Sequence, residues 1–92
     1  MKAQLYFAEG KAFTGNDGKP VNYTRFGLLL PTANDGTERK KGYDAFLFTT
    51  KAEHYEKISS LVGSTVNVEL IFVPNNEGLY KRKVSKINDF AL

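Results

Sequence analysis

The residues of this chain best suited to binding chemistry are flat aromatic rings that stand near cations. The sequence holds seven Phe, five Tyr and no Trp among 92 residues. Tyr6 stands in the first run of alternating apolar residues, and Tyr23 stands two residues before Arg25 in the second. Tyr80 directly precedes the basic triplet 81–83. Aromatic faces stack on unpaired bases and cations neutralise phosphates, so this pattern favours a surface for a single nucleic-acid strand.

The charge of the chain is modestly basic and is gathered in blocks. Thirteen Lys and Arg stand against ten Asp and Glu, which gives a net charge of +3 and a pI near 9.2. Residues 39–41 form one basic block, and residues 81–83 with Lys86 form another. Such segregation creates a local positive field that the net charge hides. Because side chains alternate on a strand, Lys81 and Lys83 share one face and Arg82 lies on the other.

Signals for catalysis are weak. His54 is the only histidine and the chain has no cysteine, so neither a metal site nor a catalytic group has the partners it needs. The glycines around the first turn precede a strand rather than a helix, which argues against a phosphate-cradling loop. We therefore expect no enzymatic activity, no metal and no cofactor, and we interpret His54 as a solvated helix residue. Three serines lie outside any nucleophile-elbow motif, namely Ser59, Ser60 and Ser64.

Length and composition indicate one domain spanning residues 1–92. A chain of this size has no room for a second core. Absence of cysteine excludes a disulfide framework, and no apolar run approaches the roughly 20 residues of a membrane span. The first residues read as a strand and not as a signal peptide. We expect a cytoplasmic setting.

Two strand-like runs surround a tight turn near the start of the chain. The first covers Lys2–Phe13 and is interrupted at Gly10, where we expect a bulge or a bend. The turn is 15–18, Gly-Asn-Asp-Gly, and the second run is Val21–Leu30. On the second run, one face carries Val21, Tyr23 and Arg25 and is predicted to be half exposed. Alternation assigns to the core Phe7, Phe13, Phe26, Leu28, Leu30 and Phe72.

A third strand-like run, Tyr43–Thr49, follows the longest loop, Pro31–Gly42. The loop contains Asn34-Asp35-Gly36, a turn signal that predicts antiparallel pairing of the second and third runs. Phe46 and Phe48 share one face of the third run. The sequence leaves open whether that face is buried or offers its rings for stacking.

The third run leads directly into a predicted helix. Thr50 and Glu53 have the spacing of a capping box, and Gly63 stands where a left-handed C-cap is needed. Strand character resumes at Thr65–Val73 and again at Leu79–Ile87, separated by the turn 74–78, with a short tail at 88–92. The apolar stripe of the helix consists of Ala52, Tyr55, Ile58, Leu61 and Val62.

Three strands, one helix and two further strands form the plan of an oligonucleotide-binding (OB) barrel. The predicted fold is therefore all-β with one helix: a five-stranded OB-type barrel whose helix lies between strands three and four.

The chain also resembles the single-stranded-DNA-binding, helix-destabilising proteins of filamentous bacteriophages. The resemblance rests on Gly18-Lys19-Pro20, on the alternating Val21, Tyr23 and Arg25, and on the hairpin 66–87 with Gly78 at its turn. It implies a symmetric homodimer that coats single-stranded DNA with little sequence preference, in the cytoplasm of a bacterial host. It also implies that Lys19 contacts phosphate, that Val21 and Tyr23 lie along the DNA, and that Lys86 is a basic position of the last strand. A general OB-fold single-strand binder from a phage or mobile element fits equally.

We therefore predict sequence-independent binding and protection of single-stranded DNA, with RNA binding or a protein-interaction module on the same barrel as alternatives. We expect Tyr6, Tyr23 and Phe48 to stack on bases. The full set of predicted nucleic-acid-binding residues is Tyr6, Lys11, Lys19, Val21, Tyr23, Arg25, Lys40, Phe48, Lys81, Lys83 and Lys86.

Overall fold

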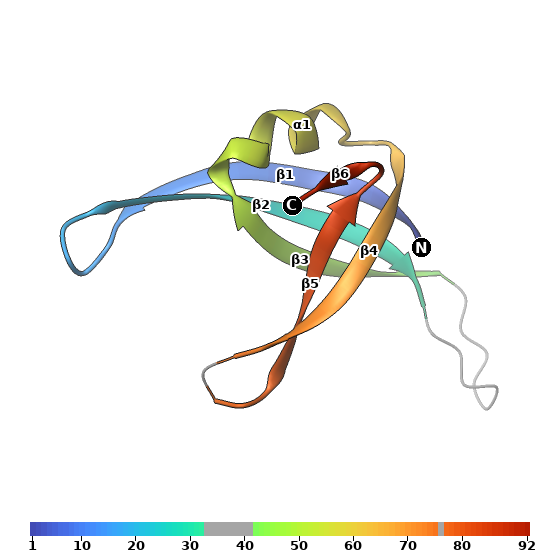
Figure 1. Ribbon diagram of the computed structural model, residues 1–92. Helices are drawn as coiled ribbons and strands as arrows, with labels where there is room; N and C mark the ends of the chain where they lie inside the picture. Colours follow the sequence, from blue (N-terminus) through green and yellow to red (C-terminus); the bar gives the residue numbers. More distant parts are fainter. Residues whose placement is uncertain (33–41, 76) are drawn as a thin grey trace.

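The structure of the protein, a computed structural model, describes residues 1–32, 42–75 and 77–92. Its elements are β1 (Lys2–Thr14), β2 (Pro20–Pro31), β3 (Tyr43–Lys51), η1 (Ala52–His54), α1 (Tyr55–Ser60), β4 (Thr65–Pro74), β5 (Tyr80–Ile87) and β6 (Phe90–Ala91). In Figure 1, β1, β2 and β3 are long curved neighbours, the β4–β5 hairpin crosses them, and α1 lies at one end.

The strands of the described segments follow the order β3-β2-β1-β4-β5-β6, and the pairings are antiparallel. β5 also passes close to β3, since the Arg82 guanidinium lies 4.2 Å from the centre of the Phe46 ring. Within the described ranges no ladder joins β3 to β5, so the sheet is not closed there. The predicted all-β class with one short helix is confirmed.

The core forms where the inner faces of the sheet meet α1. Phe26 and Leu28 are fully buried, which confirms the alternation predicted for β2. Phe48 is 8% exposed and its ring stacks on Phe26 with centroids 5.7 Å apart, so the Phe46–Phe48 face of β3 is the inner one. Leu47, which lies between them, is exposed. The core consists of Ala3, Leu5, Phe26, Leu28, Leu30, Phe48, Ile58, Val66, Val68, Val84 and Ile87.

The bulge of β1 lies at Tyr6, so the predicted bulge at Gly10 is wrong, while the alternative of a bend there stays a prediction. The register against β2 shifts between Leu5 and Phe7, so Tyr6 is the extra residue of a bulge. The shift turns Phe7 onto the outer face, where it is half-buried, and the assignment of Phe7 to the core is wrong. Gly10 stays in regular register opposite Thr24. Its missing side chain leaves room for the Tyr55 ring, which would lie 3.7 Å from a Cβ.

Two further phenylalanines assigned to the core are exposed. Phe13 is 53% exposed and Phe72 is 70% exposed. Both stand on parts of the β1–β2 and β4–β5 hairpins that project beyond the core, as Figure 1 shows for the hairpins. Phe13 lies on the outer face with Phe7, because both follow the bulge at Tyr6. Phe72 continues the alternation of the core face of β4, but no inner surface is left there to cover it.

The helix is shorter than predicted and lacks the capping box. Thr50 remains in β3, η1 begins at Ala52, and neither helical segment has a side-chain cap. Ile58 is the fully buried member of the apolar stripe, whereas Ala52 and Val62 are exposed. Gly63 has the predicted left-handed conformation, with φ +91°, but it is not the C-cap: α1 ends at Ser60 with Leu61 as its C-cap. The Gly63 N–H donates instead to the Leu5 carbonyl of β1 at 2.7 Å.

The turns and the tail complete the sheet. Gly18 and Gly78 have positive φ at the two predicted hairpin turns. The predicted tail instead forms β6, which pairs with β5 at Lys86 and Ile87 after a turn at Asn88 with φ 53°. Antiparallel pairing of β2 and β3 is confirmed. The predicted Asn34-Asp35-Gly36 turn and the basic block 39–41 lie outside the described residues.

Candidate functional site

One face of the β1–β2 ladder carries aromatic and charged side chains in alternating positions. Residues directly opposite each other in an antiparallel pair share a face, so each pair of this ladder projects its two side chains together. Beyond the bulge, four pairs, every second one along the ladder, point away from the core and form what we call the outer strip. It consists of Phe7–Gly27, Glu9–Arg25, Lys11–Tyr23 and Phe13–Val21.

A carboxylate holds two cations in the middle of the outer strip. Glu9 Oε1 lies 3.3 Å from Arg25 Nη1 and 3.5 Å from Lys11 Nζ. The guanidinium of Arg25 also lies 5.8 Å from the centre of the Phe7 ring. The three charged side chains are between 33% and 44% exposed, so water screens these pairs and each contributes at most about 1 kcal/mol to stability.

The far end of the outer strip presents an aromatic pair among lysines. The Phe13 and Tyr23 rings meet edge to face, with centroids 6.1 Å apart and an interplanar angle of 78°. Tyr23 stands opposite Lys11 on one side and opposite Lys51 of β3 on the other. A ring flanked by cations on both neighbouring strands can stack a base while its phosphates meet the ammonium groups.

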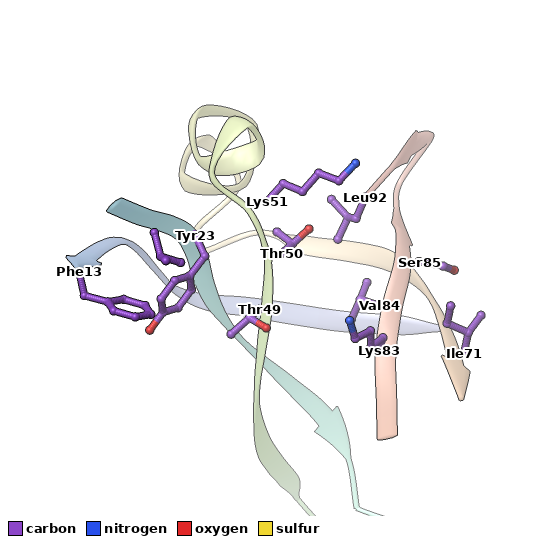
Figure 2. Close-up of a pocket in the computed structure, with 11 residues that line it drawn as sticks. Phe13, Tyr23, Thr49, Thr50, Lys51, Ile71, Lys83, Val84, Ser85 and Leu92 are labelled. Carbon is purple, nitrogen blue, oxygen red and sulfur yellow. The ribbon is translucent and has the colours of Figure 1, made fainter. Parts of the chain in front are cut away.

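A groove of about 690 Å³ separates the aromatic pair from the β4–β5 hairpin. Figure 2 shows Phe13 and Tyr23 on one side of this groove and Lys83 with Ile71 on the other, with Thr49 of β3 between the two walls. The groove is thus assembled from strands that are far apart in the sequence. Its lining consists of Phe13, Val21, Tyr23, Thr49, Thr50, Lys51, Ile71, Lys83, Val84, Ser85 and Leu92.

The β4–β5 hairpin carries a second group of cationic and aromatic side chains beside the groove. Lys81 and Lys83 border a small recess of about 60 Å³ against the exposed face of β3, as does Arg82. Arg82 lies over Phe46 at 4.2 Å from the ring centre. Phe72 stands opposite Arg82 in the β4–β5 ladder and Tyr80 lies two residues earlier on β5, and both are at least 70% exposed.

Most predicted binding residues come together on this side of the sheet. Val21, Tyr23 and Lys83 line the groove, and Lys11 and Arg25 belong to the outer strip. Lys81 lies next to the groove along β5. Tyr6, 38% exposed, covers the glycine end of the outer strip, because its ring occupies the space that a Cβ on Gly27 would need.

Three of the described binding predictions, Phe48, Lys19 and Lys86, belong neither to the groove lining nor to the outer strip. Phe48 is in the core against Phe26, so its ring faces are not offered to a base and the expectation that it stacks is corrected. Lys19 lies in the β1–β2 turn, where its N–H donates to Asp17 Oδ1 at 3.0 Å. Lys86 pairs with Ala91 of β6 and is not among the groove-lining residues, and Lys40 lies outside the described residues.

Sequence reasoning missed Phe13 and Lys51 as groove residues. Phe13 was assigned to the core by alternation, although the Gly-Asn-Asp-Gly turn two residues later indicates a strand end that runs past the core. Lys51 was placed in the helix, but it ends β3, and its carbonyl accepts a hydrogen bond from the Thr24 hydroxyl at 3.0 Å. No local signal in the sequence shows that residue 51 is still extended.

The described residues hold little that suggests other chemistry. His54 is 17% exposed at its side chain, more buried than expected for a solvated helix residue, and Nε2 lies 3.8 Å from Glu53 Oε1. Residues 1–32, 42–75 and 77–92 contain no group of three or more potential metal ligands. In the same segments, no helix has the length and apolar character needed to cross a membrane.

Comparisons of the chain with protein-family models, with curated protein sequences and with solved structures find no match. Function is therefore inferred from the geometry of the outer strip and the groove.

Proposed function

We propose that this protein binds single-stranded DNA without sequence specificity on a five-stranded OB-type barrel. The barrel assignment is supported by the pairing of β1 with both β2 and β4, the extension of these pairs by β3 and β5, and the helical segment between β3 and β4. In OB folds the β2–β3 face and the loops that join β1 to β2 and β4 to β5 bind the ligand. The groove adjoins these same elements.

The observation that carries the proposal is the position of the Phe13–Tyr23 pair across the groove from Lys83. Each base stacked on an aromatic side chain contributes roughly 1–3 kcal/mol, and the ring offers the same face to every base. Lys11 and Lys51 flank Tyr23 in register, so phosphates on either side of a stacked base meet an ammonium group. Stacking without base-edge recognition accounts for the proposed lack of sequence specificity.

The same geometry favours unpaired strands over duplex. Bases in a duplex are stacked on one another and cannot reach Phe13 or Tyr23 without unpairing. Binding of the single strand then shifts the duplex equilibrium by mass action, in proportion to the differential affinity. No bond is made or broken, so the proposed activity requires neither catalysis nor a cofactor.

The biological setting of the proposal comes from the resemblance to helix-destabilising phage proteins. It comprises protection of single-stranded DNA during replication of a phage or mobile element, a homodimeric protein, and the cytoplasm of a bacterial host. These elements are independent of the groove geometry, and light scattering of the purified protein tests the dimer separately.

The test is fluorescence anisotropy with a labelled poly-dT oligonucleotide and a matched duplex, each at 50 and 200 mM salt. We expect tighter binding of the single strand, with an affinity that falls as salt rises. Tyr23→Ala and Arg25→Ala are each expected to weaken binding, Tyr23 through stacking and Arg25 through phosphate contact. Tyr43→Ala is the matched control, because Tyr43 is 66% exposed at the opposite end of β3 and outside the groove.

Two results would contradict the proposal. One is no binding of the oligonucleotide at 50 mM salt. The other is equal loss of affinity in the Tyr23 and Tyr43 variants, which would show that the groove is not the contact surface. A labelled RNA of the same length, run in parallel, decides between DNA and RNA as the bound strand.

A protein-interaction module is the second candidate, favoured by exposed apolar side chains on the β4–β5 hairpin. Phe72, Leu79 and Tyr80 are each more than 60% exposed there. Exposed apolar groups gathered in this way mark interaction surfaces. Salt separates the two functions, because contact between apolar surfaces does not weaken steeply with ionic strength, whereas phosphate binding does.

A further inference from the structure

We propose that Glu9 is a specificity determinant of the outer strip, which lowers affinity for duplex DNA more than affinity for a single strand. This inference rests on the proposed function. Glu9 is the one acidic member of the outer strip, and a single carboxylate oxygen, Oε1, meets both Arg25 and Lys11. The two cations of the outer strip, Lys11 and Arg25, are therefore already paired in the free protein.

A phosphate that approaches Lys11 or Arg25 has to displace this carboxylate or share the cations with it. The phosphate contact then contributes less binding free energy than a contact with a free cation would. The reason is that loss of the ion pair with Glu9 offsets part of the free energy gained from the ion pair with phosphate. The cost falls on the electrostatic part of binding alone. Glu9 Oε1 pairs with Lys11 and Arg25, whereas the Phe13 and Tyr23 rings pack on each other, so the stacking surface does not depend on the Glu9 charge.

Single and double strands depend on that electrostatic part to different degrees. Binding of duplex without base contacts is almost entirely electrostatic, and its salt slope is about −0.9 per neutralised phosphate against about −0.7 for a single strand. A single strand gains further from stacking on the aromatic pair. Stacking adds to single-strand affinity but does not change the penalty from the carboxylate. Because each phosphate contact counts for more in duplex binding, a carboxylate among the cations lowers duplex affinity by the larger factor, and selectivity for unpaired strands rises.

Glu9→Gln tests this inference because it removes the charge and keeps the shape of a side chain that is already a third exposed. Glu56→Gln is the matched control: it changes the net charge equally, and Glu56 is exposed on α1 away from the outer strip. Anisotropy titrations of dT12 and a 12-base-pair duplex from 50 to 200 mM salt give the affinities and the salt slopes of the wild type and both variants.

We expect Glu9→Gln at 50 mM salt to tighten duplex binding roughly tenfold and dT12 binding roughly fivefold, with both salt slopes steeper by about one phosphate contact. The preference for the single strand then falls about twofold relative to Glu56→Gln. Equal behaviour of the two variants would overturn the inference. So would weaker dT12 binding by Glu9→Gln, which would mean that Glu9 positions Arg25 over Phe7. If the wild type shows no preference for dT12 over duplex, the proposed function fails with it.

Discussion

Tyr6 lies directly over Gly27, so closely that a Cβ at residue 27 would stand 2.5 Å from Tyr6 Cζ. The bulge in β1 produces this contact, because it inserts Tyr6 between two regular pairs of the β1–β2 ladder and lays the ring across the neighbouring strand. Gly27 is buried as a result, although its missing side chain points to the outer face. The Tyr6 ring on the outer face can thus lie against β2 only because residue 27 has no side chain.

Gly27→Ala is expected to destabilise the protein by about 1–3 kcal/mol, because the new methyl group and the Tyr6 ring cannot occupy the same space. Urea denaturation measures the change. Gly10→Ala is the control on the same ladder, since its Cβ would meet the Tyr55 ring at an ordinary 3.7 Å. Equal stability of the two variants would show that Tyr6 moves aside at little cost.

Phe13→Ala is expected to weaken dT12 binding by roughly 1–3 kcal/mol, as loss of a stacking surface does. Its effect on the free energy of unfolding should stay within about 0.5 kcal/mol, because the ring is 53% exposed on a projecting hairpin. Phe26→Ala, in the core, is expected to cost about 3–5 kcal/mol of stability. A stability loss of that size for Phe13→Ala would show that the Phe13 side chain packs as part of the core.

Phe48→Ala is expected to lower the free energy of unfolding by about 3–5 kcal/mol, because it removes a ring that packs on Phe26. Leu47→Ala changes the adjacent residue of the same strand, whose side chain is 51% exposed, and should be nearly neutral. Chemical denaturation of both variants measures the difference. The opposite ranking would mean that β3 presents its other face to the core.

Lys83→Ala is expected to reduce the salt slope of dT12 binding by about 0.7, the contribution of one phosphate contact on a single strand. Lys57→Ala is the control, because Lys57 lies over Phe90 at 5.0 Å from the ring centre and outside the groove lining. Titrations at four salt concentrations give both slopes. An unchanged salt slope for Lys83→Ala would show that Lys83 of β5 does not contact a phosphate of the bound strand.

The sequence predicted most strands and turns correctly, because each of these elements depends on a pattern within its own segment of the chain. Alternation placed Phe26 and Leu28 in the core, and glycine marked two positions of positive φ, Gly78 in the β4–β5 turn and Gly63 between α1 and β4. The extra strand β6 was missed, since a two-residue strand carries no period and depends on the ladder with β5.

The site was less predictable because it depends on register and on where the core ends. A one-residue bulge at Tyr6 placed Phe7 on the face opposite to the predicted one, and no sequence pattern around Tyr6 predicts this bulge. The same bulge misplaced Phe13, which shares the outer face of Phe7. Phe72 was misplaced because periodicity reports which face a residue shares and not whether anything covers that face. The assembly of Tyr23, Lys51 and Lys83 around one groove needed the fold.

The projecting part of the β1–β2 hairpin has a consequence for local opening. Beyond Gly10 the paired residues Ala12 and Asn22 are exposed, as is Phe13 on the other face, so neither face is covered by a core. Segments with few buried contacts open at a smaller free energy than the global unfolding of the protein. We therefore expect their amides to exchange with solvent deuterium faster than those of the core half of β2. Under the proposed function, this local opening would let the aromatic wall of the groove adjust to purines and pyrimidines of different size.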